Sequence, residues 1–134
     1  MQKNEIEDNL TGGGRLGLIK LTNSDKYLGW ILLTKILRAE NTISNFHFLD
    51  PIEDKEIIDS DLNYIAYVRD NPYQVRIIEL KKEVHESGVY ETEEDYRMNI
   101  KHHFSSLDRV EQFLTENFHF DLKDMRPSRE LDAP

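Results

Sequence analysis

The 134-residue chain predicts an α+β fold, with a mostly antiparallel β-sheet of about five or six strands and a C-terminal helix packed on one face. Three observations lead to this prediction. Short apolar runs separated by turn residues dominate residues 15–84, residues 96–104 alternate apolar with polar side chains, and residues 107–114 carry an apolar stripe with helical spacing. A chain of this length buries roughly two thirds of its unfolded surface, so it can build a core without disulfides.

Both ends of the chain are predicted to lie outside this domain. Residues 1–14 are polar and end in three consecutive glycines, which is typical of a flexible arm and hinge. Residues 125–134 contain two of the prolines and few apolar side chains, so we expect a frayed tail. The single α+β domain is therefore predicted to cover residues 15–124.

Two strands are expected at the start of the domain. Residues 15–22 form a short apolar run, residues 23–26 supply a turn, and a second apolar run covers residues 27–37. The second run fits either a strand or a Leu-rich helix. Because Gly29 in its interior costs a helix up to about 1 kcal/mol, we interpret the run as a strand.

The middle of the chain predicts a strand and a hairpin. Residues 41–49 are rich in β-forming side chains and end just before Pro51, and the acidic stretch that follows is expected to be a loop or short helix. The clearest hairpin signal has arms at residues 63–69 and 73–84, which are rich in β-branched and aromatic side chains. The three residues between the arms, 70–72, are typical of a turn.

The last two elements are a strand and a helix. Residues 96–104 alternate with period two, which predicts a half-buried strand. A helix of about three turns is expected to follow and to end near Asn117. Ser105 and Ser106 are suitable N-caps, and Asp108 lies three residues after Ser105, as in a capping box.

The chain has 17 Lys+Arg against 26 Asp+Glu and a formal net charge of −9. Two acidic segments, residues 50–61 and residues 83–95, carry this negative charge. Each contains six acids, with one lysine in the first segment and no Lys or Arg in the second. A focused negative field repels nucleic-acid phosphates and attracts a basic protein surface. The predicted partner-binding residues are Asp50, Glu53, Asp54, Glu56, Asp59, Asp61, Glu83, Glu86, Glu91, Glu93, Glu94 and Asp95. The alternative is that both segments are solvated and serve only solubility.

Composition excludes several classes of protein. The chain has no cysteine, so it is neither a disulfide scaffold, a thiolate zinc protein, an iron–sulfur protein nor a cysteine-dependent enzyme. The longest apolar stretch without charge or proline covers residues 27–34, far short of the ~20 residues of a membrane-spanning helix. Residues 1–10 carry three acids and no apolar stretch, unlike a secretory signal. We therefore expect a cytoplasmic protein that does not bind membranes.

Neither a nucleotide nor a metal is expected as a cofactor. Residues 12–17 match G-x-G-x-x-G, but a nucleotide site needs a strand before this pattern and a helix after it, whereas here a polar arm precedes it and a strand is expected to follow. His85 lacks a second histidine four residues on, and His102 and His103 point to opposite faces of a strand. The remaining histidines, His47 and His119, add no metal-ligand spacing.

One spacing is enzyme-like. Asp70 at the end of one hairpin arm and Glu79 on the next could hold Mg²⁺, while Lys81 orients or activates a water. This arrangement is similar to the PD-(D/E)xK nucleases over about a dozen residues. The order Arg-Asp-Asn-Pro at 69–72 departs from that family's pattern, and the acidic surface opposes nucleic-acid binding. A small Mg²⁺-dependent nuclease is therefore the second alternative.

The leading hypothesis is a small acidic protein-binding module that is not an enzyme. Its size, its clustered negative charge and its lack of a catalytic motif resemble bacterial immunity proteins in kind. That resemblance implies a basic partner, such as a toxin or effector, whose active cleft the module would cover. The first alternative is an acidic anti-defence protein or nucleic-acid mimic, which would use the same charge against a different partner. Direct binding of nucleic acid is not expected.

Overall fold

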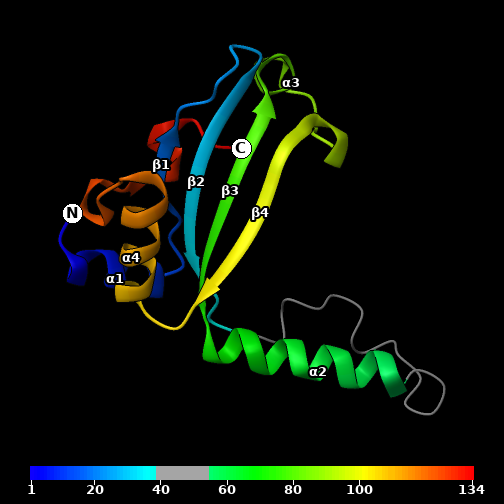
Figure 1. Cartoon of the computed structure of the whole chain (residues 1–134), viewed down its shortest axis with the longest axis vertical. Coiled ribbons are helices and arrows are strands. Elements are labelled where there is room, and N and C mark those ends of the chain that lie inside the picture. The colour runs from blue at the N-terminus through cyan, green and yellow to red at the C-terminus, as the bar shows by residue number, and fades with distance from the viewer. Residues whose placement is uncertain (39–54) are drawn as a thin grey trace.

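A computed structural model describes residues 1–38 and 55–134, and for residues 55–62 the helical backbone alone. The described residues form one five-stranded antiparallel sheet in the order β4-β3-β2-β1-β5 (Figure 1). The strands are β1 (Leu16–Lys20), β2 (Tyr27–Lys35), β3 (Tyr73–Lys81), β4 (Tyr96–Phe104) and β5 (Arg126–Pro127). The helices are α1 (Lys3–Thr11), α2 (Lys55–Asp70), α3 (Lys82–Ser87) and α4 (Leu107–Phe118), with short 3₁₀ helices η3 (Glu93–Asp95), η4 (Leu122–Asp124) and η5 (Ser128–Leu131). The predicted α+β class is confirmed.

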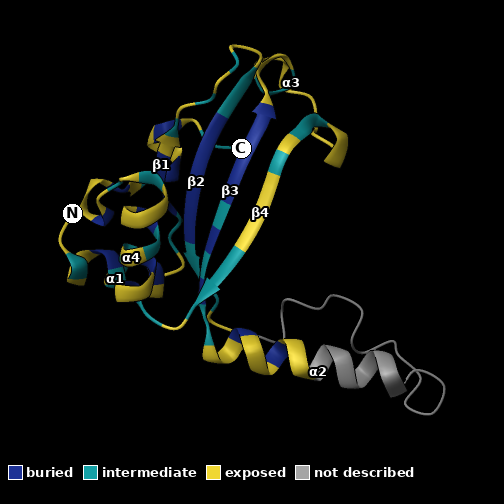
Figure 2. Ribbon diagram, viewed as in Figure 1, coloured by how far each residue is buried: buried dark blue, intermediate teal, exposed yellow. Residues whose placement is uncertain are grey.

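The main hydrophobic core lies between the sheet and the pair α1 and α4 (Figure 2). Alternate residues of β2 and β3, such as Ile31 and Val75, point to this side, which we name the helix face. The apolar stripe of α4 joins them through Leu107, Val110 and Leu114. Ser106 caps α4, because its side chain accepts a hydrogen bond from the backbone N–H of Arg109.

The opposite side of the sheet, which we name the open face, carries a smaller apolar cluster. Trp30 of β2 and Ile78 of β3 lie directly opposite each other there, and Leu131 of η5 packs on them. The Trp30 side chain donates a hydrogen bond from Nε1 to the carbonyl of Leu131 at 2.9 Å. β2 is therefore covered on both sides, and five of its nine residues are buried in succession. This explains why its sequence fits both a helix and a strand, since a central strand needs no alternation.

The frayed C-terminal tail is a wrong prediction. β5 pairs with β1, and Met125 and Leu131 are buried in the two apolar clusters. Arg15 holds the last residues by donating to Ser128 Oγ at 3.0 Å and to the carbonyl of Pro134 at 2.8 Å. The prolines lie in β5, the edge strand next to β1, and at the chain end, where a missing N–H costs the sheet little.

The flexible N-terminal arm is also a wrong prediction. Residues 3–11 form α1, and Ile6 and Leu10, spaced four residues apart, are completely buried in the main core. Two apolar residues are a weak helical signal, and a helix this short needs the apolar surface of the sheet, besides its capping box, to be stable. The glycines that follow are not a hinge: Gly12 caps α1, Gly13 has a φ of 88°, and a Cβ at Gly14 would lie 2.8 Å from the carbonyl oxygen of Asn9.

Only the second arm of the predicted hairpin is a strand. Residues 63–69 belong to α2, where Ile65 and Val68 lie three residues apart and pack with Ile36. Residues 70–72 end this helix, because Pro72 cannot continue it. β3 follows as predicted but stops at Lys81, where α3 begins. The predicted strand at 41–49 lies outside the described residues. No helix in the described part of the chain is long and apolar enough to cross a membrane.

Candidate functional site

The candidate functional site lies at the end of the sheet where β3 runs into α3 and the turn between β1 and β2 comes close (Figure 1). Hydrogen bonds fix the two ends of the site, which are the start of α3 and η3. Lys82 N–H donates to the carbonyl of Lys26 at 2.9 Å, which joins the start of α3 to the residue just before β2. At the other end η3 is closed by a capping box, in which Asp95 accepts a hydrogen bond from the N–H of Thr92 at 2.8 Å.

The acidic residues predicted in the second segment are gathered here. Glu83 and Glu86 lie on α3, Glu91 lies in the connection, and η3 carries the remaining three acids. Neither α3 nor η3 contributes a buried residue. All of these acids are exposed except Asp95, which is half-buried and used in its capping box.

The residues predicted in the first acidic segment lie outside the described side chains. Asp50, Glu53 and Asp54 lie outside the described residues, and Glu56, Asp59 and Asp61 lie on α2 where only the backbone is described. The C-terminal end of α2 and the start of α3 flank opposite ends of β3. A nine-residue strand separates such ends by roughly 30 Å. The C-terminal end of α2 is therefore far from the site at α3.

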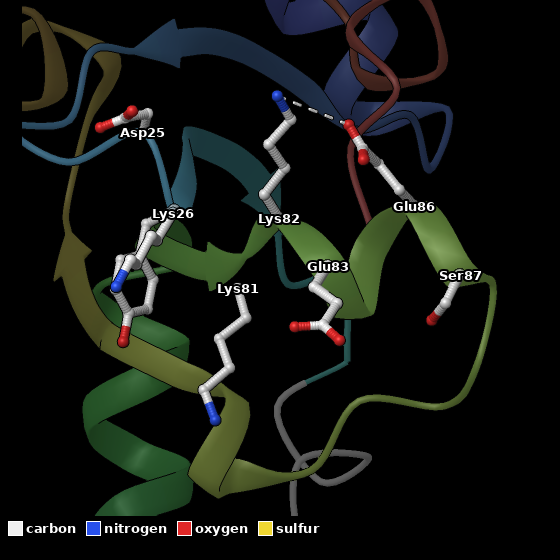
Figure 3. A pocket seen from close by; sticks show the side chains of 8 residues that line it. Asp25, Lys26, Lys81, Lys82, Glu83, Glu86 and Ser87 are labelled. Atoms are coloured by element: carbon white, nitrogen blue, oxygen red, sulfur yellow. Dashed lines mark ion pairs between the residues drawn. The ribbon is translucent and has the colours of Figure 1, made fainter.

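Lysines stand among the acids of α3. An open hollow of about 800 Å³ is lined by Asp25, Glu83 and Glu86, by Lys26, Lys81 and Lys82, and by Tyr27 and Ser87 (Figure 3). Lys82 Nζ lies 3.8 Å from Glu86 Oε1. The α3 half of the site is thus close to electrically balanced. The uncompensated negative charge lies farther along the chain, at Glu91, Glu93 and Glu94.

Two exposed apolar side chains lie between the acids, and the sequence analysis missed them. Tyr90 is 99% exposed and Val89 is 60% exposed, directly after Gly88 ends α3 in a left-handed conformation. Neither side chain belongs to a core cluster of the described residues. A lone Val-Tyr pair in a connection gives no sequence signal of exposure, because such pairs commonly pack against their own domain.

A second hollow, of about 660 Å³, borders α3 on the open face. His85 of α3 meets the Trp30 ring edge-on at 5.0 Å, and its Nε2 lies 3.2 Å from Asp132 Oδ2. Ile19 and Leu21 line the same hollow and are more than half exposed. These contacts join α3 to the C-terminal residues and so fix the position of the acidic site.

Glu79, a residue of the predicted nuclease arrangement, serves a structural ion cluster. Its Oε2 lies 2.6 Å from Lys20 Nζ and its Oε1 lies 2.7 Å from an Arg97 guanidinium nitrogen, while the Arg97 guanidinium lies over the Tyr27 ring. Burial pushes the pKa of Glu79 upward, but the hydrogen bonds from Lys20 and Arg97 outweigh it and hold the pKa below its usual value. Both carboxylate oxygens are therefore already engaged.

The other two residues of the predicted nuclease arrangement do not join Glu79: Asp70 lies far from it, and Lys81 lies near Asp95 instead. Asp70 ends α2 before β3 begins, so roughly 20 Å of strand separates it from Glu79. Lys81 is exposed and lies 3.9 Å from Asp95. The described residues contain no group of three His, Asp or Glu side chains placed to hold a metal ion.

Comparisons with known proteins add no relative. No protein-family model matches the chain, and neither a curated protein nor a solved structure is significantly similar to it.

Proposed function

We propose that this protein is a small acidic binding module that docks on a basic surface of a partner protein through residues 83–95. The observation that carries the proposal is the exposure of Tyr90 and Val89 within a run of exposed acids. Tyrosine is enriched at the energetic centres of protein interfaces, where charged residues at the rim speed association. An apolar centre flanked by Glu91, Glu93 and Glu94 matches that anatomy.

The way the segment is anchored supports the same proposal. α3 is fixed by His85 against Trp30 and Asp132, and η3 is fixed by its own capping box. Only the exposed side chains between these anchors are left to be immobilised on binding. Because immobilising each flexible side chain costs about 0.5–1.5 kcal/mol, anchored ends favour affinity.

The form of function we favour is inhibition, in which the module covers the basic active cleft of a toxin or effector in the cytoplasm. A cysteine-free chain suits a reducing compartment. The charge of the segment fits a cleft that binds nucleic acid, because such clefts are positively charged. A nucleic-acid mimic that blocks a DNA-binding protein would use the same segment, and the identity of the partner separates the two roles.

The test is capture of the partner by the full chain, followed by titration of the purified partner with variants. Replacing Tyr90 with alanine, or Glu91, Glu93 and Glu94 with lysine, should weaken binding, by about 2 kcal/mol or more for an anchor residue. The matched control replaces three exposed acids elsewhere, Asp8, Glu116 and Asp124, with lysine, which changes the net charge equally. If the control weakens binding as much as the reversal at 91–94, the attraction is non-specific and residues 83–95 are not the docking site.

A further inference from the structure

We propose that the outer edge of β4 is a second docking site, which accepts an extended segment of a partner protein with alternating apolar and acidic side chains. β4 ends the sheet on one side, and none of its nine residues is buried. Within the described part of the chain, β3 is its single strand partner. An edge strand presents a row of unpaired N–H and C=O groups, to which an extended peptide can add as a further strand.

The open-face side of this edge carries cations without counter-charges. Lys101 of β4 lies directly opposite Arg76 of β3, and like charges in that position destabilise a sheet. Arg76 donates to Asn99 Oδ1 at 2.9 Å and lies over the Tyr96 ring, but neither it nor Lys101 forms an ion pair with any described carboxylate. β4 itself contains no acid. A carboxylate from an added strand would lie next to Lys101 and relieve this repulsion.

The helix-face side of the same edge is mostly apolar, with the half-buried His102 opposite Val75 as its one imidazole among the described residues. Ile100 is opposite the buried Ile77 and is itself 44% exposed, and Met98 and Phe104 on the same side are only partly buried. Side chains of a strand alternate between the two faces. An added strand would therefore place every second side chain beside this apolar row and the others beside the cations. This alternation defines the chemistry of the partner segment.

A second copy of this chain fits the edge poorly. Pairing two β4 strands would bring the Lys101 side chains of both copies, which pair with no described carboxylate, into one strand pair that contains no acid. Lysine on an edge strand commonly prevents such self-pairing. The charge of the edge therefore favours an acidic partner over a homodimer. This edge is opposite in charge to the site at residues 83–95, so the two sites select different surfaces.

The first test uses the full chain and two capped eight-residue peptides, one alternating valine with glutamate and one alternating valine with lysine. We expect the glutamate peptide to bind at least about tenfold more tightly, and to slow hydrogen exchange of the outward-facing β4 amides. Lys101→Glu should weaken the glutamate peptide about tenfold and strengthen the lysine peptide. Lys123→Glu changes the net charge equally at an exposed site outside the sheet and should alter both affinities by less than about twofold.

The second test asks whether main-chain hydrogen bonds are used. Two versions of the glutamate peptide carry N-methyl groups on alternate backbone amides, one set on the odd positions and one on the even positions. In an added strand only one set faces β4, so only one version should lose binding. The proposal is overturned if the glutamate peptide does not bind at about 1 mM, if both methylated versions bind equally, or if sedimentation shows a dimer whose affinity Lys101→Glu changes.

Discussion

Glu79 offers a direct test of how the sheet is held together between α3 and the core. Its side chain is 5% exposed and bonded to Lys20 and Arg97, whose side chains are 15% and 33% exposed. Glu79→Gln keeps the shape of the side chain but removes its charge, which leaves two cations without their counter-ion. Removing one member of a buried ion pair costs about 3–5 kcal/mol. Because Lys20 and Arg97 can both reach water, we expect a loss of about 2–3 kcal/mol in the free energy of unfolding.

The pH dependence gives this prediction a second, independent readout. The folded pKa of Glu79 is lowered, so its contribution to stability is present above the unfolded pKa of about 4.3 and is lost as the pH falls through the folded pKa. Protonated Glu79 resembles the glutamine variant. The two proteins should therefore differ fully at pH 7, and they should converge in stability as the pH falls below the unfolded pKa of about 4.3 and through the lower folded pKa.

The assay is urea unfolding followed by circular dichroism at a series of pH values. At pH 7 the midpoint of the variant should fall by roughly 1–2 M urea. Glu83→Gln, an exposed site on the neighbouring helix, is the control and should change stability by less than about 0.5 kcal/mol. A Glu79→Gln protein as stable as the parent at pH 7, or a difference that persists unchanged at low pH, would refute the role of the ion cluster.

Three further predictions follow from the fold. Leu10→Ala should lower the unfolding free energy by about 2–5 kcal/mol, measured by chemical denaturation, whereas a mobile arm would give no change. Leu131→Ala should red-shift the fluorescence of Trp30, because Leu131 packs on that ring, and an unshifted spectrum would contradict the packing of the tail. His103 should titrate below the ordinary histidine pKa of about 6.5 in an NMR experiment, because burial lowers its pKa, and a midpoint at or above 6.5 would contradict its placement.

Local sequence patterns were sufficient for the elements that carry their own signal. The alternation at residues 96–104 identified β4, and the stripe with its serine cap identified α4, because period and capping are properties of neighbouring residues. The exposure of the acids at 83–94 was also predictable, since ionised carboxylates without partners stay in water. The class of fold followed from these elements together.

Tertiary contacts decided the structure of both ends of the chain, the type of element at residues 63–69, and which site residues are exposed. α1 and the C-terminal residues are ordered because Ile6, Met125 and Leu131 find apolar surfaces formed by distant strands, which no local pattern reveals. Residues 63–69 are β-forming by composition, yet Ile65 and Val68 are used with helical spacing. The exposure of Tyr90 and the unbalanced cations at the edge of β4 depend on which strands and helices pack beside them. Propensity is a weak local preference, and burial against sequence-distant surfaces outweighs it in free energy.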